Sequence, residues 1–307
     1  MLGGARRGSM AELLIRSGKR LGYEIKIVSY ELDTQVPIAT VGKVVPGLKW
    51  SDPGIVDDIL RVAIEHEAKI ILPFIDGSMS VAARCKEKMP SLFVPVSDPS
   101  TSLKMFDKKL SAAAFEEAGI PVPMTYKIVN AEMPVIAKPR FGSASRGIQV
   151  FYDIDDLMHL KDLSEYLLQE YIEHKREYTV DCYVSQKGEI LVTVPRERLE
   201  IMGGEVTRTI TKHIDALEKM SRDIIGKFDF RGPVTLQFLY DMDKDRYLLM
   251  EVNPRLGGGV ICSIYAGAPI PDYIISEALG VDVRPCNDWI DGTLMARYQK
   301  ETIFYNN

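Results

Sequence analysis

Apolar residues in the first hundred positions alternate between two kinds of spacing. Helical intervals occur in three segments, around Met10–Leu21, Ile55–Ala63 and Gly77–Lys88. Short apolar or β-branched runs predict strands at 24–29, 69–74 and 92–96. Strands that alternate with helices in this way predict a doubly wound parallel sheet.

The pattern changes after residue 97. We expect one helix over 98–119, ended by Gly119 and Pro121, because Gly accepts a positive φ and Pro cannot continue a helix. Beyond this helix we expect strands, mostly in hairpins, and one more helix. The strands are 124–128, 134–138, 148–152, 167–171, 178–184, 190–194, 233–240 and 246–252, and the helix is 211–228.

The last hairpin carries the most informative polar residues. Side chains two apart share a strand face, so Glu251 and Asn253 point the same way, and Gln237 lies nearly opposite on the partner strand. Such oxygens are ligands that suit Mg²⁺. Arg255 follows, where it could reach a transferring phosphoryl group. On this face we expect Leu249 as well, with the other face turned to a core: Leu248, Met250 and Val252. A merely polar hairpin end is the alternative.

A second polar segment begins at the end of the strand at 134–138. Lys138 is followed by a loop of small residues that includes Gly142, Ser143 and Ser145. Backbone N–H groups of such loops can close over phosphates, while a lysine neutralises their charge. The alternative is a flexible surface turn.

Four further places in the chain have open interpretations. The segment from Glu170 to Glu177 could receive an adenine edge and ribose hydroxyls, or be a solvated connection. Arg6 and Arg7 precede a helix, which favours an anion, and Asp76 follows a parallel strand, where it could meet an ammonium group. Ordinary turn chemistry explains both equally well. Gly258 lies in a glycine run that would let backbone approach an acyl phosphate, although the following helix also explains it.

Composition and charge narrow the class of protein. The chain has 307 residues, 46% of them hydrophobic, and a net charge of −5, so we expect no nucleic-acid partner. Four scattered cysteines indicate reduced thiols rather than a disulfide framework or a zinc site. No apolar stretch is long enough to span a bilayer. We therefore expect a cytoplasmic protein without a membrane partner.

Common nucleotide and hydrolase motifs fail. Gly3 and Gly8 have the glycine spacing of a Walker A loop, but Ser9 stands where its lysine belongs. Ala5 replaces the second glycine of the dinucleotide fingerprint, and the segment from Gly77 to Val81 lacks the closing glycine of a nucleophile elbow.

Taken in order, these segments resemble the ATP-grasp superfamily, in particular its carbamoyl-phosphate-synthase-like stand-alone ligases. The strongest match is the run Met250-Glu251-Val252-Asn253-Pro254-Arg255, preceded by Val234-Thr235-Leu236-Gln237-Phe238. The pair Asp107-Lys108, inside the helix expected over 98–119, looks like the family's Asp-Lys or Asp-Arg pair.

The resemblance implies a role for each matching residue. Gln237, Glu251 and Asn253 would hold magnesium, and Arg255 and Lys138 would be catalytic. The implied ATP site is Lys108, Lys138, Gly142, Ser143, Ser145, Glu170, Tyr171, Ile172 and Glu177. Arg196 and Arg208 match only vaguely, and we interpret them as surface arginines.

It also implies a fold and an activity. We expect a Rossmann-like pre-ATP-grasp domain over 1–97 and a two-lobed α+β ATP-grasp domain over 98–307. The latter would contain a lid at about 120–170 and an antiparallel-sheet subdomain at about 171–307. The implied reaction activates a carboxylate as an acyl phosphate and couples it to an amine, with ATP and Mg²⁺ (or Mn²⁺) and release of ADP. A non-catalytic ATP-binding regulator and a phosphotransferase that forms an acyl phosphate without ligation remain alternative functions. For the oligomeric state, a homodimer is one candidate.

Two features depart from the family pattern. The first strand is reduced to Met1 and Leu2. The chain also ends at Asn307 without the second half that processes carbamate, so we do not expect carbamoyl-phosphate synthesis itself.

Overall fold

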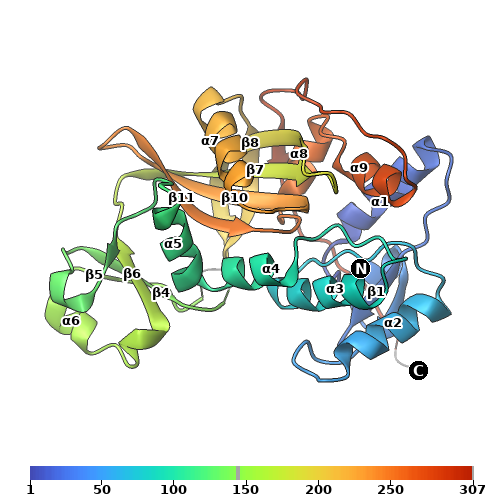
Figure 1. Cartoon of the computed structure of the whole chain (residues 1–307), viewed down its shortest axis with the longest axis horizontal. Coiled ribbons are helices and arrows are strands. Elements are labelled where there is room, and N and C mark those ends of the chain that lie inside the picture. The colour runs from blue at the N-terminus through green and yellow to red at the C-terminus, as the bar shows by residue number, and fades with distance from the viewer. Residues whose placement is uncertain (143–145, 306–307) are drawn as a thin grey trace.

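The computed structural model describes residues 1–142 and 146–305, and they form a mixed α/β molecule. Figure 1 shows a small sheet with α6 at one end, the N-terminal elements at the opposite end, and a larger sheet with its helices beside both.

The N-terminal part contains six elements. They are α1 (Gly8–Arg20), β1 (Val28–Glu31), the 3-10 helix η1 (Pro37–Thr40), β2 (Lys43–Pro46), α2 (Ile55–Glu65) and α3 (Asp76–Lys88). α1 packs in one hydrophobic cluster and α2 and α3 in another. This is the arrangement of helices that a sheet covered on both faces requires.

The expected parallel sheet is regular only in part. β1 and β2 pair in parallel. Isolated parallel bridges join Leu2 to Tyr30 and Pro73, and Ile70 to Phe93. The runs 69–74 and 92–96 therefore contact one another in the expected direction, but too few of their residues pair for strands. Parallel pairing is thus present, and a continuous doubly wound sheet stays a prediction.

Residues 98–119 form two helices rather than the single helix expected. α4 (Pro99–Phe106) and α5 (Lys108–Glu117) meet at Asp107. The Asp107 carboxylate accepts hydrogen bonds from the backbone N–H groups of Lys109 (3.0 Å) and Leu110 (3.2 Å). An aspartate that caps the first turn in this way begins a new helix, so the Asp-Lys pair lies at a helix start and not inside a helix.

A four-stranded antiparallel sheet follows, with its strands in the order β3-β6-β4-β5. Its elements are β3 (Thr125–Tyr126), η2 (Ile128–Asn130), β4 (Val135–Pro139), β5 (Gln149–Phe151), α6 (Ile154–Met158), η3 (Leu163–Glu165) and β6 (Tyr166–Glu170). Its core is small and contains Val135, Ala137, Leu157 and Leu168. The strands lie where the sequence predicts them, within a few residues.

The larger sheet has six strands in the order β11-β10-β7-β8-β9-β12. They are β7 (Lys175–Val184), β8 (Ile190–Met202), β9 (Glu205–Thr211), β10 (Gly232–Asp241), β11 (Arg246–Asn253) and β12 (Leu294–Ala296). The sequence-based expectation of a helix from residue 211 is wrong at its start. Residues 205–211 form β9, because they pair with β8 and β12, and α7 begins later (Asp215–Lys227).

The two faces of this sheet differ sharply in chemistry. On β7, Tyr178, Val180 and Cys182 enter the core beneath α7. The residues between them, Glu177, Thr179 and Asp181, take the other face. Cross-strand pairing puts Gln237 and Arg196 beside Thr179 on that second face. The functional groups therefore collect on the face opposite α7.

The C-terminal helices close the fold against the N-terminal part. α8 (Val260–Tyr265) and α9 (Ile270–Ala278) follow the glycine run. α9 lies beside α1 (Figure 1), and Tyr273 and Ile274 share a core with Met10 and Leu14. Within the described residues, no helix is both long and apolar enough to cross a membrane.

Candidate functional site

A cavity of about 310 Å³ lies where the two sheets, α3, α4 and α5 meet. Its walls include Lys108 and Lys138 on one side and Gln237, Glu251 and Asn253 on the other. The cavity thus brings together two cations and an oxygen-rich cluster that are 99 or more residues apart in sequence.

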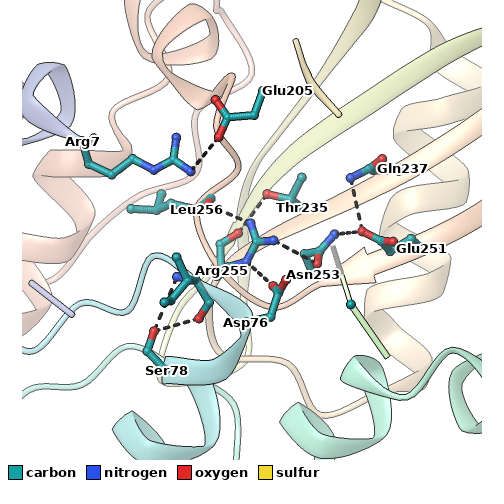
Figure 2. Close-up of polar contacts among 12 residues, drawn as sticks. Arg7, Asp76, Ser78, Glu205, Thr235, Gln237, Glu251, Asn253, Arg255 and Leu256 are labelled. Atoms are coloured by element: carbon teal, nitrogen blue, oxygen red, sulfur yellow. Dashed lines mark hydrogen bonds and ion pairs between the residues drawn. The ribbon is translucent and has the colours of Figure 1, made fainter. Parts of the chain in front are cut away.

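The hairpin β10–β11 supplies that cluster as strand alternation predicts. Gln237 pairs directly with Glu251, and Thr235 with Asn253. The Glu251 carboxylate accepts hydrogen bonds from Gln237 Nε2 (3.4 Å) and from the Asn253 side-chain amide. One carboxylate and two amides therefore converge at the end of the hairpin (Figure 2).

On the N-terminal side of Glu251, at residues 248–250, the predicted alternation of side chains between the two strand faces is wrong. A β-bulge leaves Met250 without a direct partner, and Leu249 pairs with Phe238 in the core beneath α7. Leu248 and Met250, expected in that core, instead pack in a separate cluster with Ile172 and Leu239. The extra residue of a bulge shifts the side-chain phase by one. The hairpin consequently presents an apolar wall next to its polar end.

The cluster continues in both directions as a chain of contacts between opposite charges and amides. Arg198 Nη1 donates to Gln237 Oε1 (3.0 Å) and pairs with Glu177 (3.0 Å). At the other end, Arg255 Nη2 donates to Asn253 Oδ1 (3.3 Å), and Arg255 Nε pairs with the Asp76 carboxylate. Figure 2 shows these contacts as one row of side chains that leads from Gln237 through Glu251, Asn253 and Arg255 to Asp76.

Lys138 lies at the end of β4 and is buried. Its Nζ donates to Gln169 Oε1 (2.8 Å), and Gln169 is buried as well. Burial lowers the pKa of Lys138 to about 8, although the negative charge of Glu251 acts in the opposite direction. A lysine held this far from water is poised to meet a polyanion.

Lys108 faces the start of the small-residue loop. Its Nζ donates to the carbonyl of Gly142 (2.6 Å), and its backbone N–H donates to the carbonyl of Arg140 (3.0 Å). Arg140 in turn pairs with Asp107 (2.6 Å). Ser143 and Ser145, also predicted to bind ATP, lie outside the described residues.

The segment predicted to receive adenine borders the cavity. Ile172 packs with Leu239 and Leu248, an apolar surface that suits a planar base. The Glu170 carboxylate is already engaged by Arg246 (3.0 Å) and by the backbone N–H of Met124 (3.0 Å). Glu170 therefore anchors the segment through its side chain.

The N-terminal loop at Arg6 and Arg7, expected to bind an anion, already holds a carboxylate of the chain itself. Glu31 is buried and accepts hydrogen bonds from Ser29 Oγ (2.6 Å) and from the backbone of Gly4 and Ala5. This carboxylate occupies the loop's own donors. Arg6 is exposed to solvent. Arg7 turns toward Glu205, which its Nη2 contacts at 3.4 Å (Figure 2).

Asp76 and Gly258 lie at the two sides of Arg255. Asp76 is the first residue of α3 and, as a partner of Arg255, already meets a cation from within the chain. The Gly258 carbonyl accepts a hydrogen bond from Arg297 (2.5 Å). A Cβ on Gly258 would lie 3.2 Å from Arg7 Nη1. A side chain at this position would therefore press on the guanidinium of Arg7.

Arg196 is not the surface arginine that we expected. It is 1% exposed and forms a bidentate pair with Asp181, while its Nη1 donates to Thr209 Oγ1 (3.0 Å). A Cβ on Gly259 would lie only 2.6 Å from Arg196 Nη1. The buried pair and the glycine run therefore fit together, and Arg196 supports the loop after Arg255. Arg208 is exposed, as predicted.

Sequence reasoning missed two residues that line the cavity, Gln169 and Arg198, and two that pair with each other beside Arg7, Glu205 and Arg297. Arg198 had a usable signal, because it lies two residues from Arg196 on a strand face. Arg297 had none, since its role depends on the pairing of β12 with β9.

The donor set fits a magnesium ion bound together with phosphate. The described residues contain no group of three or more His, Cys, Asp or Glu side chains placed to hold a metal alone. Mg²⁺ binds through one or two carboxylates and completes its shell with waters and phosphate oxygens. Glu251 could supply the carboxylate. The amide oxygens of Gln237 and Asn253 accept from Arg198 and Arg255 here, so they would join the metal site only after the two amide groups turn toward Glu251.

Comparison with known proteins agrees with this architecture. Residues 162–301 match the family described as "ATP-grasp in the biosynthetic pathway with Ter operon". The biotin carboxylase domain of *Hydrogenobacter thermophilus* 2-oxoglutarate carboxylase, solved with MgADP, ADP and bicarbonate, superimposes with a TM-score of 0.75 at 18% identity. That match covers 94% of this chain and 71% of the other. N5-carboxyaminoimidazole synthetase from *Staphylococcus aureus* gives 0.74 at 19% identity, over 96% and 80%. Residues 162–301 thus match an ATP-grasp family, and the chain shares its fold with these solved structures.

Its curated relatives make the placement more specific. The C-terminal section of the carbamoyl phosphate synthase large chain from *Methanopyrus kandleri* is 23% identical over 262 residues, which is 76% of this chain and 48% of the relative. The large chain from *Bifidobacterium animalis* is 24% identical over 206 residues, or 60% and 18%. The predicted resemblance to carbamoyl-phosphate-synthase-like proteins is confirmed, while the chain spans less than half the length of these relatives.

Proposed function

We propose that this chain is a Mg²⁺- and ATP-dependent ligase that activates a carboxylate as an acyl phosphate and couples it to an amine, releasing ADP. One observation carries the proposal: the buried cation of Lys138 and the Glu251 cluster line the same cavity. A triphosphate bound between them would meet a lysine on one side and a metal-binding carboxylate on the other.

The same arrangement assigns a task to each group. A carboxylate oxygen of the first substrate attacks the γ-phosphorus, and ADP leaves. Lys138 and Lys108 neutralise phosphate charge, and the Gly142 loop orders the phosphates. Bound Mg²⁺ would supply further charge neutralisation. The amine then attacks the acyl carbon, its surplus proton passes to solvent, and phosphate leaves while Arg255 stabilises the developing charge.

Further parts of the proposal concern organisation. We propose a pre-ATP-grasp domain at 1–97, a lid at about 120–170 and a C-terminal subdomain at about 171–307. The apolar surface at Ile172 would receive adenine, and Glu177 would bind the ribose.

The free thiols of Cys85, Cys182, Cys262 and Cys286 favour the cytoplasm as the location of this protein. Mn²⁺ as an alternative metal and a homodimeric state belong to the same proposal.

Substrate-dependent release of ADP tests the activity. A panel of carboxylates, with and without amines, is screened with Mg²⁺ and ATP. Hydroxylamine added to a reactive mixture should give a hydroxamate, because only an acyl phosphate reacts in that way. ADP release without a hydroxamate would indicate a different phosphoryl transfer, and binding of ATP without any ADP release would indicate a regulator.

Glu251→Ala tests the metal assignment. We expect loss of turnover by at least about a hundredfold, because the charge that orders Mg²⁺ and the phosphates is removed. The circular dichroism spectrum and melting temperature should stay close to those of the original chain. Glu87→Ala, which removes an exposed glutamate of α3, is the matched control and should keep full activity. Near-normal turnover in Glu251→Ala would remove Glu251 from the site.

A further inference from the structure

Four segments of the chain converge beside Arg255. Arg7 directly precedes α1, Arg297 follows β12, Glu205 begins β9, and Gly258 belongs to the glycine run. Glu205 bridges the two arginines through different oxygens: Oε1 lies 3.4 Å from Arg7 Nη2, and Oε2 lies 2.6 Å from Arg297 Nη1. A single carboxylate thus spans two guanidinium groups.

Positive charge is in excess at this place. Burial lowers the pKa of Arg7, the positive charges of Arg255 and Arg297 lower it further, and Glu205 acts in the opposite direction. Arg255 already has Asp76 as its partner. Arg7 and Arg297 therefore share Glu205 alone among the carboxylates that pair with them in the described part of the chain. Two clustered guanidinium groups with one shared carboxylate can accept another anion.

The position of Glu205 suits displacement. Its side chain is 42% exposed, so little burial holds it in place. It follows a turn of two glycines, Gly203 and Gly204, which both have positive φ values. Gly204 lines the cavity, and its carbonyl accepts a hydrogen bond from Arg198 Nη2 (3.2 Å). The turn is thus linked to the same row of side chains as Glu251.

We propose that Glu205 is a placeholder carboxylate, and that a carboxylate or phosphate group of the second substrate replaces it on Arg7 and Arg297. The inference rests on the proposed function, because it names the chemistry of the substrate that reacts beside Arg255. The second substrate is then an anionic amine, such as an amino acid or a phosphorylated amine, rather than a neutral or cationic one. No bond is made or broken at this subsite.

Binding of simple anions to the full chain tests the proposal without any turnover. Malonate and inorganic phosphate are titrated separately by calorimetry, which distinguishes the two sources of negative charge. Glu205→Gln removes the competing charge and should tighten binding of one or both probes by up to about fivefold, the range expected for a partly exposed ion pair. Glu200→Gln, an exposed glutamate of the same hairpin, is the matched control and should leave the affinity unchanged.

Two further variants assign the effect to this cluster. Arg297→Gln in the Glu205→Gln background should abolish the gained affinity, and so should Arg7→Gln. Arg297 lies at the surface end of a short strand, so its variant should fold even where Arg7→Gln does not. No tightening in Glu205→Gln, or a tightening that survives Arg297→Gln, would overturn the proposal. A chain that binds malonate as expected yet never releases ADP would instead refute the ligase activity alone.

Discussion

Single residues at this site are defined by partners that lie far away in sequence. Burial and the charge of Glu251 act in opposite directions on the pKa of Lys138. Arg255 is oriented by Asp76, which lies 179 positions earlier. The residue types that carry the chemistry were readable from the motif around Asn253. Their pairing was not, because strand alternation determines which face a side chain takes but not which distant group meets it.

Lys138 should give the reaction a pH dependence. Its pKa of about 8 lies below the ordinary lysine value of 10.5, so the side chain is charged below pH 8 and loses its proton as the pH rises through 8. We expect kcat/KM for ATP to fall across that range, because this parameter reports the free enzyme. Bound phosphates raise the pKa again, so kcat should fall less.

Lys138→Arg is the matched test of that limb. A guanidinium stays charged throughout, so the fall near pH 8 should disappear, although overall activity will be lower because the larger group must fit beside Gln169. Rate profiles for ATP between pH 6.5 and 9.5 provide the measurement. An identical falling limb in both proteins would show that another group titrates.

Some helices and strands of this chain were not predicted from the sequence, in part because tertiary contacts determine them. The two-helix arrangement at Asp107 and the strand β9 were both missed. β9 is a strand because β8 and β12 flank it, which is a tertiary cause. The bulge at Met250 had no signal either, because Leu248, Leu249 and Met250 are all apolar and fit either phase. The strands of the four-stranded sheet were predicted within a few residues, since their apolar pattern is local.

Asp107 couples a helix start to the predicted phosphate loop. Asp107→Ala should lower the free energy of unfolding by about 1–2 kcal/mol through loss of the helix cap. It should also raise KM for ATP, because Arg140 loses its partner and the backbone contact between Arg140 and Lys108 loosens. Urea denaturation and ATP titration of turnover measure the two effects.

Asp98→Ala separates capping from nucleotide binding. Asp98 caps α4 through Ser100 and Thr101 without an arginine partner in the described residues. Its loss should cost about 1 kcal/mol and leave KM for ATP unchanged. A similar KM in both variants would show that Asp107 acts only as a cap.

The whole molecule assembles the site from four regions of the chain. The four-stranded sheet contributes Lys138, the six-stranded sheet Glu251, the N-terminal part Asp76, and helix α5 Lys108. The alternation of helices and strands predicted the N-terminal helices, and the motif around Asn253 predicted the resemblance to ATP-grasp proteins. How α1 would share a core with α9 could not be predicted, because apolar spacing reveals a buried face but not its partner.

The contact between Asp76 and Arg255 should therefore matter for catalysis more than for nucleotide binding. Asp76→Asn keeps the shape and one acceptor oxygen but removes the charge that holds Arg255 beside Asn253. We expect kcat to fall by about ten- to a hundredfold, as for a displaced positioning group, while KM for ATP changes less than threefold, since Lys108 and Lys138 are untouched. Asp57→Asn removes an exposed carboxylate of α2 that pairs with Lys88, and it should leave both parameters unchanged. If Asp76→Asn raises KM for ATP and leaves kcat intact, the N-terminal part serves nucleotide binding instead, and Arg255 is positioned by Asn253 alone.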